Sequence, residues 1–183
     1  MAEESVSVLP QVVSYLLFAL IAIAAVSDIR SRRIPNWLTF GGMLVGLAVN
    51  AALLGSRGLK TSALGLLVGF GVYFALYLFR AIGAGDVKLM GAVGALVGPS
   101  NWWSVFLVAA IAGGVAALIA IAVRGRFRHT LWNIGFAFNE VIHLRAPFLA
   151  SEEMDVTSSR AMRLPHAVPI AVASLILLAR QRL

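Results

Sequence analysis

The chain has 183 residues, of which 60% are hydrophobic and 13% charged, against about 45–50% and about 25% in a typical soluble domain. This composition excludes an ordinary soluble domain and indicates a single membrane-embedded domain over residues 1–183. Cysteine is absent, which excludes disulfides and cysteine nucleophiles. The net charge is +7, and the basic residues lie mostly between hydrophobic segments. In that position we expect them to set membrane orientation rather than to bind nucleic acid.

Six hydrophobic segments are candidates for membrane spans, which need about 20 apolar residues each. They cover approximately residues 11–27, 37–54, 62–79, 87–98, 103–123 and 164–179. The fourth is short, because about 12 helical residues reach only about 18 Å, against a hydrocarbon core of about 30 Å. In the third, Gly65 and Gly69 form a pair that indicates close helix packing. The pattern predicts an all-α protein with six transmembrane helices.

The basic residues predict the orientation of these spans. If the N-terminus lies outside, all but four of the 15 Lys and Arg residues fall on the cytoplasmic side. The four on the outer side are Arg57, Lys60, Arg180 and Arg182. Because cytoplasmic loops carry an excess of Lys and Arg, we expect both termini outside.

The least hydrophobic stretch, residues 124–163, is predicted to stay on the cytoplasmic side. Its apolar residues recur at helical spacing, namely Phe127, Leu131, Ile134, Phe138, Val141 and Ile142. This spacing indicates an amphipathic helix in the membrane interface. A packed cytoplasmic helix is the alternative.

Two acids stand at the margins of hydrophobic spans. Asp28 closes the first span and Asp86 opens the fourth, and the orientation derived from Lys and Arg puts both on the cytoplasmic side. Charges close to a span are costly and usually functional.

Two carboxyl groups around one water molecule suit an aspartic protease, in which an ionised group takes a proton and a protonated group binds the scissile carbonyl. Two like charges about 4 Å apart repel by about 4 kcal/mol at an effective dielectric of about 20, so the pair shares a proton. The structural alternatives are that Asp28 pairs with a nearby arginine and that Asp86 is a helix N-cap.

The sequences around both acids resemble one family. Residues 27–39 (SDIRSRRIPNWLT) resemble the first aspartate motif of type IV prepilin peptidases, and residues 83–90 (GAGDVKLM) resemble the second, the GxGD motif. The resemblance implies that Asp28 and Asp86 are the catalytic pair, with no metal and no cofactor.

The same resemblance implies roles for residues beside the acids. Gly83 and Gly85 are expected to let the backbone turn tightly and approach the substrate. Pro35 and Asn36 are expected to start the second span, with Asn36 as its cap. Lys88 is expected to orient a carboxylate or bind a lipid phosphate.

Members of that family cut the leader from prepilins at the cytoplasmic face of the bacterial inner membrane. The expected partners are therefore a prepilin, membrane lipid and pilus or secretion assembly machinery. Larger members carry two CxxC pairs before the first span and also N-methylate the product. This chain has no Cys and its first span starts at about residue 11. It resembles the short Flp/Tad-pilus type, for which methyltransferase activity is not expected.

One part of the sequence departs from the family pattern. Where the last span of the family often begins with a Pro-Tyr-Gly-like motif, this chain has Pro165, His166 and Ala167. His166 lacks ligand spacing with His129 and His143, which again predicts no metal site. Two other functions are open from the residues alone: a small proton-coupled transporter and a non-catalytic membrane assembly factor.

Overall fold

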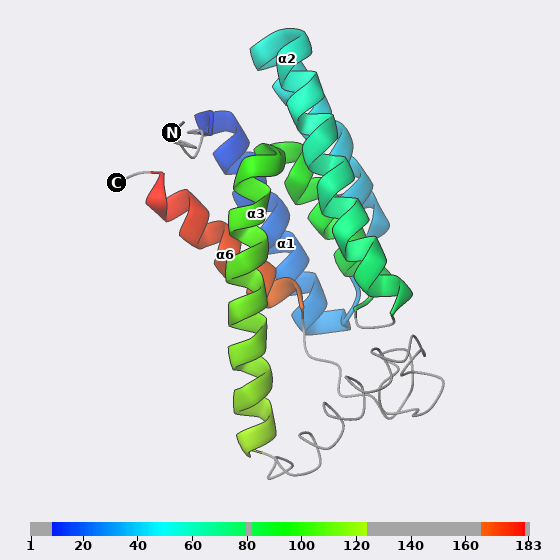
Figure 1. Ribbon diagram of the computed structural model, residues 1–183, viewed down its shortest axis with the longest axis vertical. Helices are drawn as coiled ribbons and strands as arrows, with labels where there is room; N and C mark the ends of the chain where they lie inside the picture. The colour runs from blue at the N-terminus through cyan, green and yellow to red at the C-terminus, as the bar shows by residue number, and fades with distance from the viewer. Residues whose placement is uncertain (1–8, 80–81, 124–165, 182–183) are drawn as a thin grey trace, which may run out of the picture.

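All regular secondary structure among the described residues is helical. The computed structural model describes residues 9–79, 82–123 and 166–181. They form α1 (Gln11–Ser31), α2 (Asn36–Leu78), α3 (Ala84–Val123) and α6 (Ala167–Arg180) (Figure 1). Three of these helices, α1, α2 and α3, are long and apolar enough to cross a membrane, and α6 is a shorter apolar helix. The all-α class is confirmed, whereas the predicted amphipathic helix in residues 124–163 lies outside the described residues.

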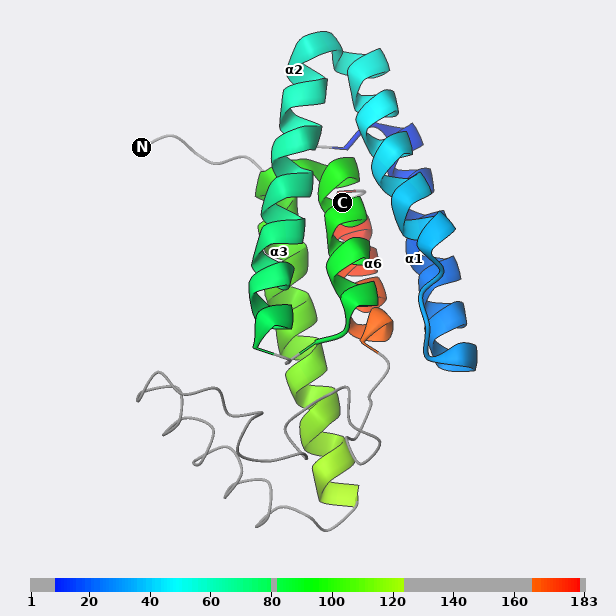
Figure 2. The same ribbon diagram turned by 90° about the vertical axis from the view of Figure 1, so that its right-hand side faces the viewer.

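Helices α2 and α3 each consist of two legs separated by a break. The breaks lie at Gly55, with φ 60°, and at Gly98, with φ 74°, a region that glycine enters without steric cost. Pro99 follows the second break and cannot donate the helical hydrogen bond. At each break the chain turns back on itself (Figure 2). The legs correspond to the predicted segments 37–54, 62–79, 87–98 and 103–123, but the connections are tighter than predicted because helix resumes directly after each break.

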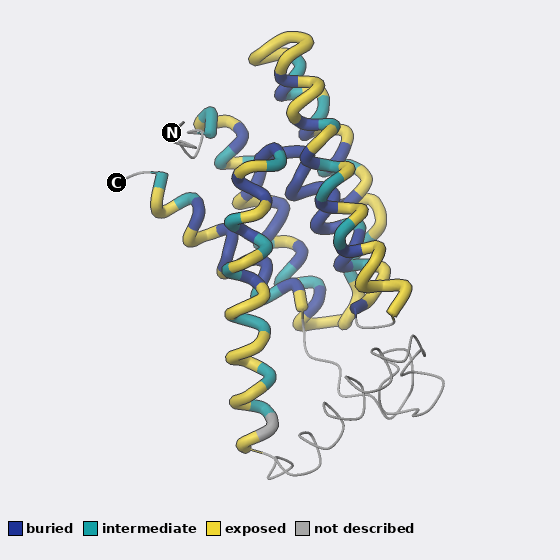
Figure 3. The backbone as a smooth tube through the Cα atoms, viewed as in Figure 1, coloured by how far each residue is buried: buried dark blue, intermediate teal, exposed yellow. Residues whose placement is uncertain are grey.

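The first leg of α3 is the centre of the bundle. Every residue from Leu89 to Gly98 is buried, and dark blue is concentrated in the middle of the bundle in Figure 3. Helix α3 contacts α1, α2 and α6. Because protein surrounds this leg, it does not have to match the thickness of the hydrocarbon core by itself. This arrangement accounts for the short fourth segment in the sequence.

Glycines allow the second leg of α2 to touch this central leg. A Cβ atom at Gly65 would collide with the backbone carbonyl of Gly94, and a Cβ atom at Gly94 would collide with that of Gly65. Gly69 similarly faces the carbonyl of Met90. Small residues permit such close approach in membrane helices, so the packing role predicted for Gly65 and Gly69 is confirmed.

Polar side chains of α2 compensate for the hydrogen bonds lost at the second break. Pro99 has no N–H for the carbonyl of Ala95, four residues earlier. The buried Asn50 Nδ2 donates to the carbonyls of Ala95 at 3.1 Å and Leu96 at 3.2 Å, and the buried Ser62 hydroxyl donates to that of Ala95. Side chains of α2 thus donate to carbonyls at the end of the central leg.

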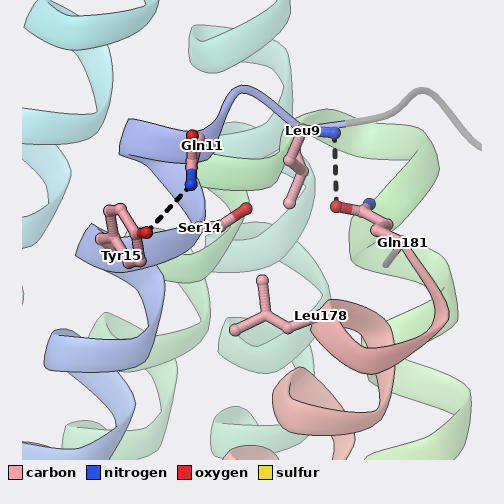
Figure 4. A pocket seen from close by; sticks show the side chains of 6 residues that line it. All are labelled: Leu9, Gln11, Ser14, Tyr15, Leu178 and Gln181. Carbon is pink, nitrogen blue, oxygen red and sulfur yellow. Dashed lines mark hydrogen bonds between the residues drawn. The ribbon is translucent and has the colours of Figure 1, made fainter. Parts of the chain in front are cut away.

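Helices α1 and α6 run antiparallel. At the end away from Asp28, the N–H of Leu9 donates to Oε1 of Gln181 at 3.3 Å (Figure 4). A pocket of about 400 Å³ lies there and is lined by Leu9, Gln11, Ser14, Tyr15, Leu178 and Gln181. The opposite end of this helix pair holds the candidate site.

Candidate active site

Asp28 is held by the last helix of the described structure. It lies in the last turn of α1 and is 8% exposed. Its Oδ2 accepts a hydrogen bond of 3.0 Å from the backbone N–H of Ala167, the first residue of α6. The amino end of a helix favours a negative charge, whereas the carboxyl end of α1 disfavours it. In the described part of the chain Asp28 forms no ion pair with Arg30, Arg32 or Arg33, so this contact takes the place of the pairing with arginine that was the alternative for Asp28.

Asp86 lies in the first turn of α3 and is also 8% exposed. The carbonyl of Gly83 accepts the N–H groups of Asp86 at 3.1 Å and Val87 at 3.4 Å, which makes Gly83 the N-cap. Oδ2 of Asp86 in turn accepts the N–H of Gly83 at 3.3 Å. This bond is one of the two in a capping box, in which the side chain of the third helical residue accepts the N–H of the N-cap residue. The alternative that Asp86 is itself the N-cap is therefore wrong, because Asp86 lies three residues inside that cap.

The fold brings the two acids to the same end of the bundle. Asp86 interacts electrostatically with Asp28, and also with His166 at the start of α6. The three residues come from α3, from α1 and from the residue before α6. Two largely buried carboxyl groups therefore lie close enough for the charge of one to act on the other.

The glycines before and after the start of α3 provide space rather than an unusual backbone conformation. Among the described residues the positive-φ glycines are Gly55 and Gly98, so neither Gly83 nor Gly85 adopts the left-handed conformation that favours glycine. A Cβ atom at Gly83 would lie 3.5 Å from Oδ2 of Asp86, and one at Gly85 would lie 3.5 Å from Ile34, both ordinary contacts.

The start of α2 differs from the prediction in one respect. Pro35, with φ −62°, is the N-cap, and its carbonyl accepts the N–H groups of Leu38 and Thr39. Asn36, the predicted cap, is instead the first helical residue. Its Oδ1 accepts a hydrogen bond of 2.9 Å from Nζ of Lys88.

Lys88 therefore links α3 to α2. Its ammonium group also lies 5.3 Å from the centre of the Phe40 ring. Within the described residues, Lys88 is bonded to Asn36 rather than to either candidate carboxyl group.

Two features of the site were not predicted from the sequence. One is the start of α6, where the N–H of Ala167 donates to Asp28 and His166 interacts electrostatically with Asp86. The other is Ser27, whose hydroxyl donates to the carbonyl of Arg33 at 2.8 Å and fastens the loop between α1 and α2. The signal for Ser27 is its place beside Asp28 in the motif. The sequence predicts a span over residues 164–179, but the only signal at its start is the departure from the family pattern at His166 and Ala167.

The chain matches the model of the type IV leader peptidase family over residues 15–118, a range that includes both acids. It is 36% identical over 118 residues to a prepilin leader peptidase/N-methyltransferase of Burkholderia pseudomallei (strain 1026b), covering 60% of this chain and 37% of that protein. It is 29% identical over 129 residues to the protein of the same name in Escherichia coli (strain K12), covering 67% of this chain and 56% of that protein.

A third relative is the type 4 prepilin-like proteins leader peptide-processing enzyme of Escherichia coli O78:H11, which is 32% identical over 111 residues, covering 57% of this chain and 41% of that protein. The chain thus spans between 37% and 56% of the length of these relatives. No solved structure matches significantly. The family match covers more than half of the chain, and the chain belongs to the type IV leader peptidase family.

Proposed function

We propose that this member of the type IV leader peptidase family is an aspartic endopeptidase that removes the leader peptide from a prepilin. The observation that carries the proposal is that Asp28 and Asp86, two largely buried acids from different membrane helices, lie at the same end of the bundle and interact electrostatically. Both lie within the residues that match the family. Relatives that are 29–36% identical are named for prepilin leader processing.

The proposed reaction is hydrolysis of one peptide bond by one water molecule. The ionised carboxyl group of the pair takes a proton from water, and the water oxygen attacks the carbonyl carbon of the scissile bond. The protonated carboxyl group donates to the carbonyl oxygen. When the tetrahedral intermediate collapses, the C–N bond breaks and the amine leaves with a proton, so that the pair again holds one shared proton.

The surroundings of the pair support this chemistry. The N–H groups of Ala167 and Gly83 each donate to one carboxyl group and fix its orientation. Gly83 and His166 are exposed beside these contacts. The small glycines leave room for a substrate backbone next to Asp86.

We further propose six passes across the bacterial inner membrane, with both termini outside and the two acids at the cytoplasmic face. The breaks at Gly55 and Gly98 divide α2 and α3 into the four middle passes. Arg30, Arg32 and Arg33 follow Asp28 in the chain, so the acids share their end of the bundle with basic residues, as the positive-inside rule requires. The Flp/Tad class of substrate stays a prediction of the sequence resemblance.

The test uses the whole purified chain in detergent, incubated with a prepilin whose leader is followed by mass spectrometry. We expect a single cut that adds one water, and no cut with either Asp28→Asn or Asp86→Asn. The matched control is Asp155→Asn, which changes the only other aspartate in the sequence and is expected to cut normally. Cutting by an Asp28 or Asp86 variant at the wild-type rate would refute the acid pair as the catalyst, and absence of cutting by the wild-type chain would favour a non-catalytic assembly role.

A further inference from the structure

Three arginines lie on the short turn between α1 and α2. Arg30 is in the last turn of α1, and Arg32 and Arg33 follow it before α2 begins at Asn36. All three are exposed, and in the part of the chain that the structure describes none of their guanidinium groups forms a hydrogen bond or an ion pair. Three neighbouring positive charges are therefore available to a partner.

The backbone of this turn adopts a conformation that is unfavourable for an arginine. Arg32 has φ 51° and ψ 34°, and among the described residues it is the one non-glycine residue with a positive φ. Its N–H donates to the carbonyl of Asp28 at 2.8 Å and closes the end of α1. Glycine usually occupies such a helix end, because it lacks the Cβ atom that makes the left-handed backbone unfavourable. An arginine at this strained position points to a role for the side chain itself.

Two serines fix the position of the turn. The Ser27 hydroxyl donates to the carbonyl of Arg33 at 2.8 Å. The Ser31 hydroxyl donates to the carbonyl of Ser27 at 2.8 Å and to that of Arg33 at 3.4 Å. These bonds tie the backbone that carries Arg32 and Arg33 to the last turn of α1. A site whose backbone is fixed in advance loses less conformational freedom when a ligand binds.

The apolar residues on either side of the turn place it at a membrane surface. Ile29 is 62% exposed and Trp37 is 69% exposed, and both belong to helices that are long and apolar enough to cross a membrane. An exposed isoleucine suits the acyl chains, and tryptophan is enriched at the level of the lipid headgroups. The guanidinium groups between these two residues in the chain are therefore expected at the level of the lipid phosphates.

We propose that this arginine turn, residues 30–33, binds the phosphate group of an anionic phospholipid. A guanidinium group can donate two parallel N–H···O bonds to a phosphate. Each basic residue near an anionic membrane surface raises the affinity about fivefold. The binding is independent of the proposed peptidase activity, because it uses neither carboxyl group of the acid pair.

The experiment measures ligand binding to the whole purified chain in an uncharged detergent by native mass spectrometry. The ligands are short-chain phosphatidylglycerol, phosphatidylcholine with the same acyl chains, and glycerol phosphate. One triple variant changes the turn, with Arg30→Gln, Arg32→Gln and Arg33→Gln. The control removes the same charge from exposed positions beside the break of α2 and at the end of α6, with Arg57→Gln, Lys60→Gln and Arg180→Gln.

We expect wild type and the control to bind phosphatidylglycerol at least about tenfold more tightly than phosphatidylcholine, and the turn variant to lose this preference. Equal affinity of wild type for the two lipids would overturn the inference. An equal loss in both triple variants would also overturn it, because net charge would then explain the binding. Glycerol phosphate that binds as tightly as phosphatidylglycerol would assign the turn to soluble phosphate compounds instead.

A single change separates the role of the Arg32 side chain from its effect on folding. Arg32→Gly relieves the positive φ, so without lipid it should melt no lower than wild type. Its affinity for phosphatidylglycerol should nevertheless fall about fivefold. Wild-type affinity in this variant would show that the strained arginine does not bind the lipid.

Discussion

The backbone N–H of Ala167 donates a hydrogen bond of 3.0 Å to Oδ2 of Asp28, an acid that precedes it by 139 positions in the chain. This bond places the amino end of α6 against the carboxyl end of α1. A carboxylate at the end of α1 meets unfavourable carbonyl dipoles, and α6 offsets them with its own N–H groups. The candidate site is therefore completed by a helix that lies outside the family match.

A larger side chain at Ala167 is expected to disturb the site without touching either acid directly. Ala167 is 1% exposed, so Ala167→Leu has no space and should push the start of α6 away from Asp28. We expect the cleavage rate to fall at least tenfold. Ala167→Gly keeps the N–H and the space, and Ala179→Leu adds the same bulk at an exposed position of α6. Equal cleavage by Ala167→Leu and these two controls would show that the α6 contact is dispensable.

The close contact between α2 and α3 gives a prediction about stability. Gly65→Ala places a methyl group against the backbone carbonyl of Gly94, which cannot move aside as a side chain can. We expect a loss of about 1–3 kcal/mol in the free energy of unfolding, measured by denaturant titration in detergent.

The control for this prediction is Gly71→Ala in the same leg of α2. A Cβ atom at Gly71 meets nothing within 4 Å. Because alanine is the better helix former, we expect this variant to be as stable as wild type or slightly more stable. Equal destabilisation by both changes would contradict the packing described for Gly65.

Asn50 is expected to stabilise the break after the central leg. Asn50→Leu removes the donor to the carbonyls of Ala95 and Leu96, which are buried. The Ser62 hydroxyl still donates to the carbonyl of Ala95, so the main loss is the side-chain donor to Leu96, and removing a donor from a buried acceptor costs about 1–3 kcal/mol. Thr61→Ala is the control, since Thr61 is exposed and donates only within its own helix, to Arg57. If Thr61→Ala lowers the melting temperature as much as Asn50→Leu or more, the role assigned to Asn50 is wrong.

Lys88 and Asn36 are expected to act on each other rather than on the chemistry. A double-mutant cycle with Lys88→Met and Asn36→Ala should give a coupling of about 0.5–1.5 kcal/mol in stability, typical of one hydrogen bond. Cleavage by Lys88→Met should stay within about tenfold of wild type. A loss as complete as that of Asp86→Asn would place Lys88 in the reaction itself.

The sequence predicted the helices well because their determinants are local. Hydrophobic length located the legs of α2 and α3, and the flanking charge motifs located Asp28 and Asp86. The sequence predicted the positions of the breaks less closely, because a positive φ at Gly55 or Gly98 depends on how the two legs pack. Asn36 was predicted as a cap because Asn favours that position, but its side chain is taken by Lys88, 52 positions away.

The contributions of Ala167 and His166 were beyond sequence reasoning for the same physical reason. A backbone N–H has no signature in the residue types, and its contact with Asp28 exists only once α6 packs antiparallel to α1. The burial of the central leg likewise depends on three neighbouring helices. In the sequence it was visible only as a segment too short to span the membrane alone.

The most direct test of the central claim is a cleavage-rate cycle with Asp28→Asn, Asp86→Asn and the double variant, each checked for folding. If the two acids act as a unit on one water, each single change should lower the rate by at least about 1000-fold, and the double variant should be no slower than the slower single one. A single variant that keeps more than about a tenth of the wild-type rate would contradict the shared mechanism, as would a double variant whose loss equals the product of the two single losses.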